Sequence, residues 1–107
     1  MTIIAPSILS ADFAHLADDV KRVVEGGAEY IHIDVMDGSF VPNITIGSPV
    51  VKALRPLTDK TFDVHLMVEH PETQFKSFAD AGADIITFHV EVAPHAHRLI
   101  QQIHDLG

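Results

Sequence analysis

Short hydrophobic runs alternate with segments whose apolar residues recur every three or four positions, and this alternation occurs four times along the chain. Runs of the first kind are typical of β-strands, and segments of the second kind are typical of helices. We expect strands at residues 3–9, 29–35, 61–68 and 84–90. We expect helices at residues 13–25, 49–54, 71–81 and 94–105. Ser10 or Asp12 is placed to cap the first helix, and Gly26 with Gly27 is placed to end it.

The order of these elements predicts the fold class. Strands that alternate with helices form a parallel sheet with right-handed crossovers. The sequence GAEYI at 27–31 returns as GADII at 82–86, which marks the same helix-to-strand boundary twice. We therefore expect an α/β protein with four consecutive βα units and parallel strands. This is the pattern of the N-terminal half of a (βα)₈ TIM barrel, in one partial domain that covers residues 1–107.

Half a barrel leaves surfaces that need cover. A complete barrel takes at least about 200 residues, whereas this chain has 107. Four strands alone leave two open edges and an uncovered inner face. We expect either a truncated barrel or a half-barrel that associates with another copy through its open edges.

Candidate chemistry lies in two of the expected strands. Side chains two apart in a strand share a face, so His32 and Asp34 project together. In the next strand, Asp63, His65 and Met67 share a face in the same way. Neighbouring strands would bring His32, Asp34 and His65 together, and two imidazoles with a carboxylate are typical ligands of a divalent metal.

Composition and charge narrow the class of protein. The formal charge is −8 with seven Lys and Arg residues in no cluster, which argues against nucleic acid and anionic membranes as partners. No apolar run approaches the roughly 18 residues of a membrane-spanning helix, and the first residues lack the pattern of a secretory signal. The absence of cysteine leaves nitrogen and oxygen as metal ligands and is compatible with a reducing cytoplasm. We predict a cytoplasmic protein.

Four blocks of sequence resemble one family closely. They are APSILSADF at 5–13, HIDVMDGSFVPNITIG at 32–47, DVHLMV at 63–68 and AGADIITFH at 81–89. In their order and spacing they resemble the N-terminal half of ribulose-phosphate 3-epimerase. The resemblance implies an isomerase of the pentose phosphate pathway, in which a metal-dependent proton transfer through an enediolate converts ribulose 5-phosphate to xylulose 5-phosphate.

The resemblance also implies roles for individual residues. His32, Asp34 and His65 match three of four ligands to a divalent metal, usually zinc or iron; nitrogen and oxygen ligands also suit manganese and cobalt. Asp34 matches one of two aspartates that exchange a proton at C3, which makes it the catalytic candidate. Ser7 and His65 match residues that contact the phosphorylated ketose. Met36 and Met67 match methionines that shield the planar intermediate.

The chain also departs from that family. The second aspartate and the glycine-rich phosphate loops belong to the C-terminal half and are absent. We therefore expect the chain alone to be a poor catalyst or inactive. Two other functions stay open: epimerisation of a hexulose phosphate such as allulose 6-phosphate, and a non-catalytic, self-associating half-barrel.

Several neighbouring residues receive a simpler interpretation. Asp63 is expected to orient groups around it, and Asp37 with Gly38 to form the turn that ends its strand. His89 and Glu91 follow the last strand and can line the site, with no specific role assigned. The remaining histidines are expected to be exposed on helices or loops, namely His15, His70, His95, His97 and His104.

Overall fold

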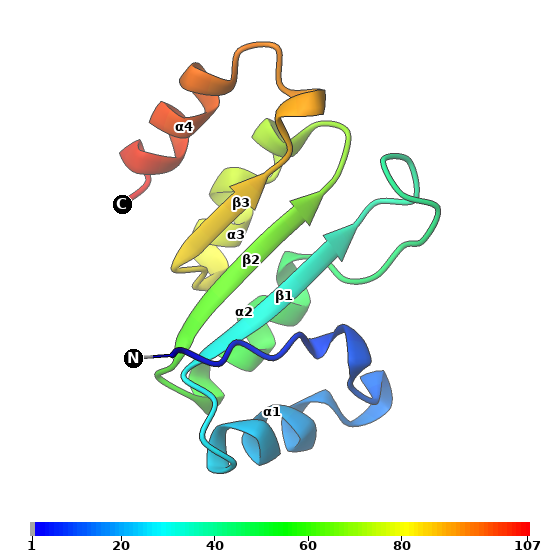
Figure 1. Cartoon of the computed structure of the whole chain (residues 1–107), viewed down its shortest axis with the longest axis vertical. Coiled ribbons are helices and arrows are strands. Elements are labelled where there is room, and N and C mark those ends of the chain that lie inside the picture. Colours follow the sequence, from blue (N-terminus) through cyan, green and yellow to red (C-terminus); the bar gives the residue numbers. More distant parts are fainter. Residues whose placement is uncertain (1) are drawn as a thin grey trace.

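A computed structural model describes residues 2–107 of the chain. Its centre is one sheet of three parallel strands in the order β1-β2-β3 (Figure 1). The strands are β1 (Tyr30–Met36), β2 (Thr61–Met67) and β3 (Ile85–Phe88). The helices are α1 (Leu16–Glu25), α2 (Ser48–Leu54), α3 (Phe75–Ala81) and α4 (Ala96–Asp105). Short 3₁₀ turns cover Ile8–Ser10, Phe13–His15, Arg55–Leu57, Pro71–Thr73 and Val90–Val92.

Helices cover one face of the sheet. In both β1 and β2 every second residue is buried, as the branched and aromatic side chains of these strands require. The buried set comprises Ile31, Ile33, Val35, Phe62, Val64 and Leu66. It packs in one core with residues of the helices, including Val51 of α2 and Phe78 of α3, and these two helices lie behind the sheet in Figure 1. The opposite face, which carries the polar side chains, is only half-buried.

The prediction of a regular first strand at residues 3–9 is wrong. Residues 3–9 run beside β1, where His32 N–H donates to the carbonyl of Pro6 and Ser7 forms a single bridge with His32. Proline has no N–H to continue the ladder. The Ser7 hydroxyl then accepts from the Leu9 amide and starts the first 3₁₀ turn. The sheet of the described chain therefore has three strands where the pattern predicts four.

The other predicted elements are present with shifted ends. Asp12, and not Ser10, caps the helical segment that begins at Phe13, because its carboxylate accepts from the Ala14 amide. The segment that opens at Pro71 begins as a 3₁₀ turn, so α3 starts at Phe75, and α4 starts at Ala96. The α/β class and the parallel order are confirmed.

The sheet is open. Within residues 2–107, no strand pairs with the outer edge of β3, while residues 4–7 lie along the outer edge of β1. None of the helices in that range combines the length and the apolar character needed to cross a membrane.

Candidate metal centre

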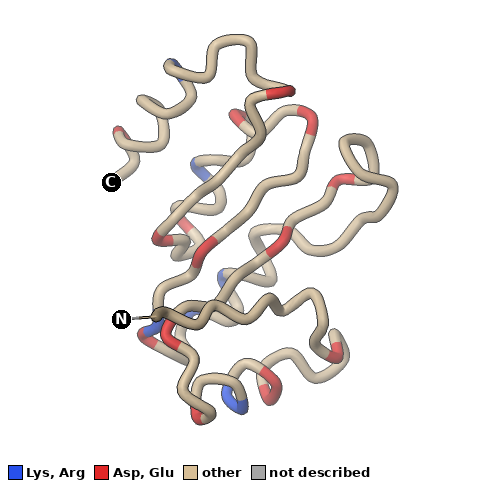
Figure 2. The backbone as a smooth tube through the Cα atoms, viewed as in Figure 1, with Lys and Arg blue, Asp and Glu red and all other residues tan. Residues whose placement is uncertain are grey.

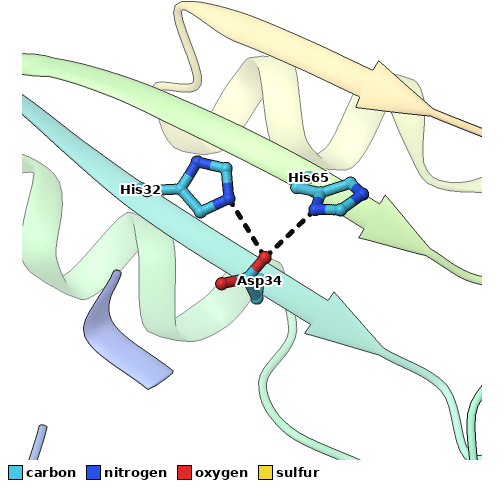
Figure 3. A group of neighbouring side chains, drawn as sticks. All are labelled: His32, Asp34 and His65. Carbon is cyan, nitrogen blue, oxygen red and sulfur yellow. Dashed lines mark hydrogen bonds and ion pairs between the residues drawn. The ribbon is translucent and has the colours of Figure 1, made fainter. Parts of the chain in front are cut away.

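The register of β1 against β2 assembles the site. Asp34 pairs with His65, and their side chains project from the open face of the sheet together with that of His32. Figure 3 shows both imidazoles directed at the same carboxylate oxygen: Asp34 Oδ1 lies 3.0 Å from His32 Nε2 and 3.1 Å from His65 Nδ1. One potential ligand atom from each of the three residues lies within 4.8 Å of the others. The cluster predicted from strand parity is therefore present.

The donor set fits a divalent metal ion. Two imidazole nitrogens and a carboxylate oxygen are ligands that zinc, iron and neighbouring metals accept. The surrounding charge also favours a cation, because the strands contain Asp34 and Asp63 but no Lys or Arg. Figure 2 shows the few basic residues on helices and loops and none within a strand.

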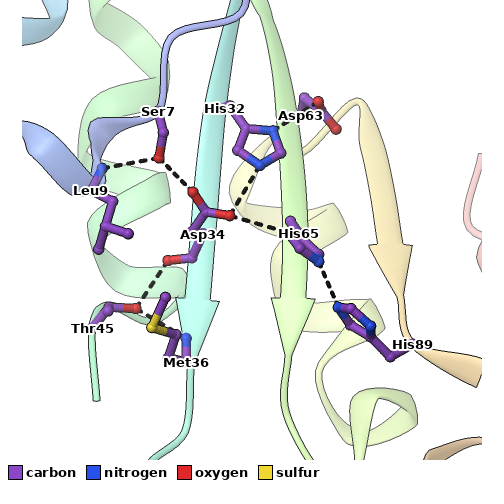
Figure 4. Close-up of polar contacts among 9 residues, drawn as sticks. All are labelled: Ser7, Leu9, His32, Asp34, Met36, Thr45, Asp63, His65 and His89. Carbon is purple, nitrogen blue, oxygen red and sulfur yellow. Dashed lines mark hydrogen bonds and ion pairs between the residues drawn. The ribbon is translucent and has the colours of Figure 1, made fainter. Parts of the chain in front are cut away.

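Two segments outside the sheet hold Asp34 in place. The Ser7 hydroxyl donates to Asp34 Oδ2 at 2.5 Å, so both carboxylate oxygens are engaged (Figure 4). The Thr45 hydroxyl donates to the Asp34 carbonyl at 2.9 Å and accepts from the Met36 amide. Ser7 therefore contacts the cluster through Asp34, and its contact with a substrate stays a prediction. Thr45 was not predicted, because nothing in a loop sequence indicates which strand a hydroxyl will reach.

Asp63 orients His32. Its Oδ2 lies 2.9 Å from His32 Nδ1, on the side of the ring opposite to Asp34. A carboxylate at Nδ1 favours the tautomer with its proton on that nitrogen, which leaves Nε2 free to act as a ligand. Asp63 thus contacts a neighbouring site residue, as expected, and its orienting role stays a prediction.

The charges of this cluster stabilise one another. Burial raises the pKa of Asp34, but the hydrogen bond from Ser7, the charge of His32 and the contacts with both imidazoles outweigh it and leave that pKa below its ordinary value. Burial lowers the pKa of His32, but the contact with Asp63 and the charges of Asp34 and Asp63 outweigh it and leave that pKa above its ordinary value. Asp34 is thus ionised at neutral pH, as a ligand or a base must be.

The two methionines lie one step further along the strands. Met36 pairs with Met67 in the sheet register, on the same face as Asp34 and His65, and both are half-buried. They therefore form an apolar border at the carboxyl end of the cluster.

The remaining histidines separate into two groups. His89 reaches the site, with its Nε2 2.7 Å from His65 Nε2, although the sequence pattern assigned it no specific role. The five histidines expected to be exposed are exposed, namely His15, His70, His95, His97 and His104.

Comparison with known proteins identifies the family. Residues 3–107 match the ribulose-phosphate 3 epimerase family, and the chain belongs to it. The chain is 60% identical to the ribulose-phosphate 3-epimerase of Synechocystis sp. in an alignment of 107 positions that covers 98% of the chain and 46% of that relative. It is 60% identical to the ribulose-phosphate 3-epimerase of Bacillus subtilis over 104 residues, 97% of the chain and 48% of that relative. The chloroplastic ribulose-5-phosphate-3-epimerase of Arabidopsis thaliana is 55% identical over 98% of the chain and 38% of its own length.

These comparisons confirm the resemblance found in the sequence. The chain spans about half the length of the Synechocystis and Bacillus relatives. The open three-stranded sheet agrees with an N-terminal part of a barrel, because the remaining strands of a barrel would close the sheet.

Proposed function

We propose that the chain supplies the metal-binding half of an enzyme that epimerises ribulose 5-phosphate to xylulose 5-phosphate at C3, a step of the pentose phosphate pathway. The observation that carries this proposal is the convergence of two imidazoles on the ionised Asp34, in a chain that belongs to the epimerase family. The bound partner is then a phosphorylated ketose. The cytoplasmic location stays a prediction from composition.

The proposed cofactor is one divalent metal, with zinc or iron(II) first and manganese or cobalt as alternatives. His32, Asp34 and His65 would hold it. Such an ion supplies Lewis-acid polarisation of the C2 carbonyl, which makes the proton at C3 more acidic.

Asp34 is the proposed base on one face of the substrate. Its lowered pKa keeps the carboxylate ionised, and the Ser7 hydroxyl fixes one of its oxygens. The proton removed from C3 passes to Asp34, and an acid on the opposite face returns a proton to the enediolate. By the family resemblance, that acid is an aspartate of the C-terminal half.

Four neighbours of Asp34 are proposed to act on the substrate by position. Ser7 and His65 lie on either side of the carboxylate and would contact the ketose. Met36 and Met67 would exclude water from the planar intermediate and so limit its protonation by solvent.

The test is an epimerase assay with added zinc or iron(II), on protein made in a host that lacks its own epimerase. We expect no turnover by the chain alone and turnover when it is mixed with the C-terminal half of the Bacillus subtilis relative. Asp34→Asn should lower that turnover by about 100- to 10,000-fold, whereas Asp18→Asn on the exposed side of α1 should not change it. A folded mixture without activity would contradict the proposal.

The identity of the ketose requires a separate comparison. A hexulose phosphate such as allulose 6-phosphate presents the same carbonyl and C3 proton, and the proposed cluster would contact only that part of a substrate. The completed barrel should therefore be assayed with both phosphates. Faster turnover of the hexulose phosphate would replace the pentulose assignment without changing the role of Asp34.

A second candidate function is a non-catalytic half-barrel that pairs with its own copy. Among the described residues the outer edge of β3 has no strand partner, and large apolar side chains near it favour this candidate: Ile85, Val90 and Ile100 are 38%, 66% and 45% exposed. Sedimentation velocity tests it. A dimer at micromolar concentration supports self-association, and a well-folded monomer excludes it.

A further inference from the structure

His89 contacts the proposed metal ligand His65 on the side that faces away from Asp34. It follows β3 directly, and the register of His65 with Thr87 puts His89 on the same open face of the sheet. The two Nε2 atoms lie 2.7 Å apart, and the rings are stacked with centroids 4.9 Å apart. Phe40, from the loop after β1, also packs against His89, with 4.9 Å between ring centroids. His89 thus contacts both an aromatic ring and a proposed ligand.

Glu91 limits the direction of the hydrogen bond between the two histidines. A neutral imidazole has one N–H and one acceptor nitrogen, so across the 2.7 Å contact one ring donates and the other accepts. The carboxylate of Glu91 lies 3.4 Å from His89 Nδ1 and can only accept, which favours a proton on that nitrogen. With the proton there, His89 Nε2 accepts and His65 Nε2 donates, which is the direction that Glu91 favours.

This direction decides which nitrogen of His65 is free. When Nε2 of neutral His65 carries the proton, Nδ1 presents its lone pair to Asp34 Oδ1 at 3.1 Å, where a metal would bind. Asp34 alone favours the opposite tautomer, because its carboxylate accepts a proton from Nδ1. Two carboxylates, Asp34 and Glu91, therefore compete for the orientation of the same pair of rings.

We propose that His89, directed by Glu91, is a positioning residue that holds His65 in the tautomer able to bind the metal. The proposal rests on the metal site proposed above. His89 is not a ligand itself, since its Nε2 faces the far nitrogen of His65. A partner at the second nitrogen is what ligand histidines in general require for orientation.

The test combines metal affinity with direct observation of the tautomer. Three variants of the full chain separate the contributions: His89→Phe keeps the stacking on His65 and loses the acceptor, His89→Gln keeps an acceptor oxygen, and Glu91→Gln changes an exposed group. Zinc affinity is measured by competition with a chromophoric chelator. The His65 tautomer is read from long-range ¹H–¹⁵N correlation spectra of the metal-free chain.

We expect His89→Phe to weaken zinc binding by about 10- to 100-fold and to shift metal-free His65 towards the tautomer with its proton on Nδ1. His89→Gln should restore most of the affinity, and Glu91→Gln should give a smaller loss than His89→Phe. The proposal is overturned if His89→Phe binds zinc as tightly as the wild type, or if its His65 tautomer is unchanged. Failure of the wild-type chain to bind zinc would contradict the metal site instead, and the tautomer spectra would still decide the role of His89.

Discussion

Three side chains from three segments meet on the carboxylate of Asp34. Ser7 comes from the turn before α1, His32 from β1 itself and His65 from β2. A carboxylate with both oxygens engaged has little rotational freedom. Its position is therefore set before any metal or substrate binds, which is the condition for an effective ligand or base.

The same argument extends to His32 and predicts the effect of removing Asp63. Asp63→Ala should weaken zinc binding by about 10- to 100-fold, because the imidazole loses the carboxylate that orients Nε2 toward the metal. Asp63→Asn, which keeps an acceptor oxygen, should recover part of the loss. Zinc competition measures both, with Asp59→Ala in the exposed loop before β2 as the matched control. Equal affinities for Asp63→Ala and the control would contradict the orienting role.

At the scale of elements, Asp37 joins the loop after β1 to the loop after β2. Its carboxylate accepts from the Glu69 amide at 2.8 Å and from the amides of Ser39 and Phe40, each at 2.9 Å. The Glu69 amide lowers the pKa of Asp37 most; burial opposes it, and the amides of Ser39 and Phe40 add to the lowering. The turn predicted at Asp37 and Gly38 is thus also a connection between strand ends.

This connection predicts a dependence of stability on pH. A lowered pKa in the folded state stabilises the fold above the unfolded value of 3.8, and the contribution is lost as the pH falls through the folded pKa. Asp37→Asn should therefore lower the free energy of unfolding at pH 7 and have a much smaller effect below the folded pKa. Urea unfolding at several pH values measures this, with Asp18→Asn as the control. An effect of the same size at every pH would exclude a charge-dependent connection.

The end of α3 depends on Arg55. The guanidinium donates to the Gly82 carbonyl and to Asp84, both at 3.0 Å, and lies 3.8 Å from the centroid of the Phe62 ring. Gly82 has a φ of 114°, and a Cβ there would collide with the Cδ of Arg55 and lie 2.6 Å from its Cγ. Glycine is therefore required both by the backbone and by the space.

Two glycines separate these requirements. Gly82→Ala should destabilise the fold by about 3–5 kcal/mol, because it adds backbone strain and also displaces the hydrogen-bonded Arg55. Gly27→Ala is the matched control, since its φ is 107° and nothing lies within 4 Å of the added Cβ. It should cost about 1–2 kcal/mol from strain alone. Urea denaturation measures the free energy of unfolding of both variants. Equal losses of stability would mean that Arg55 moves away from the added Cβ without cost.

At the scale of the whole molecule, the chain buries only one face of its sheet. Parallel strands normally have both faces of their sheet buried. The open face holds the cluster of candidate metal ligands, and the edge of β3 has no strand partner among the described residues. The missing half of a barrel would supply what both features lack: a strand next to β3 and a cover for the open face.

A complementary C-terminal half should therefore stabilise this chain. A partner that binds only the folded chain adds free energy by mass action, about 2.7 kcal/mol when its free concentration is 100 times Kd. Thermal unfolding of the chain with increasing amounts of the Bacillus subtilis C-terminal half measures the effect. Thermal unfolding at increasing concentrations of the chain alone is the comparison. Stabilisation by its own copies, and not by the C-terminal half, would favour the self-associating half-barrel.

The sequence by itself determined the fold class, the elements apart from the first strand, and the central cluster. These follow from local rules: the period of apolar residues distinguishes strand from helix, and parity within a strand puts His32 with Asp34 and Asp63 with His65. One further condition, that these two strands are neighbours, brings the three candidate ligands together. Adjacent βα units meet that condition in most α/β folds.

Only the tertiary structure decided the partners of the cluster and the fate of residues 3–9. Ser7 reaches Asp34 across 27 positions and His89 reaches His65 across 24, so both contacts depend on how loops and strand ends are placed in space. Residues 3–9 have an apolar pattern typical of a strand, yet Pro6 interrupts the ladder and the Ser7 turn redirects the chain. Local periodicity measures the tendency to be extended, whereas pairing depends on which N–H and C=O groups the neighbouring segment presents.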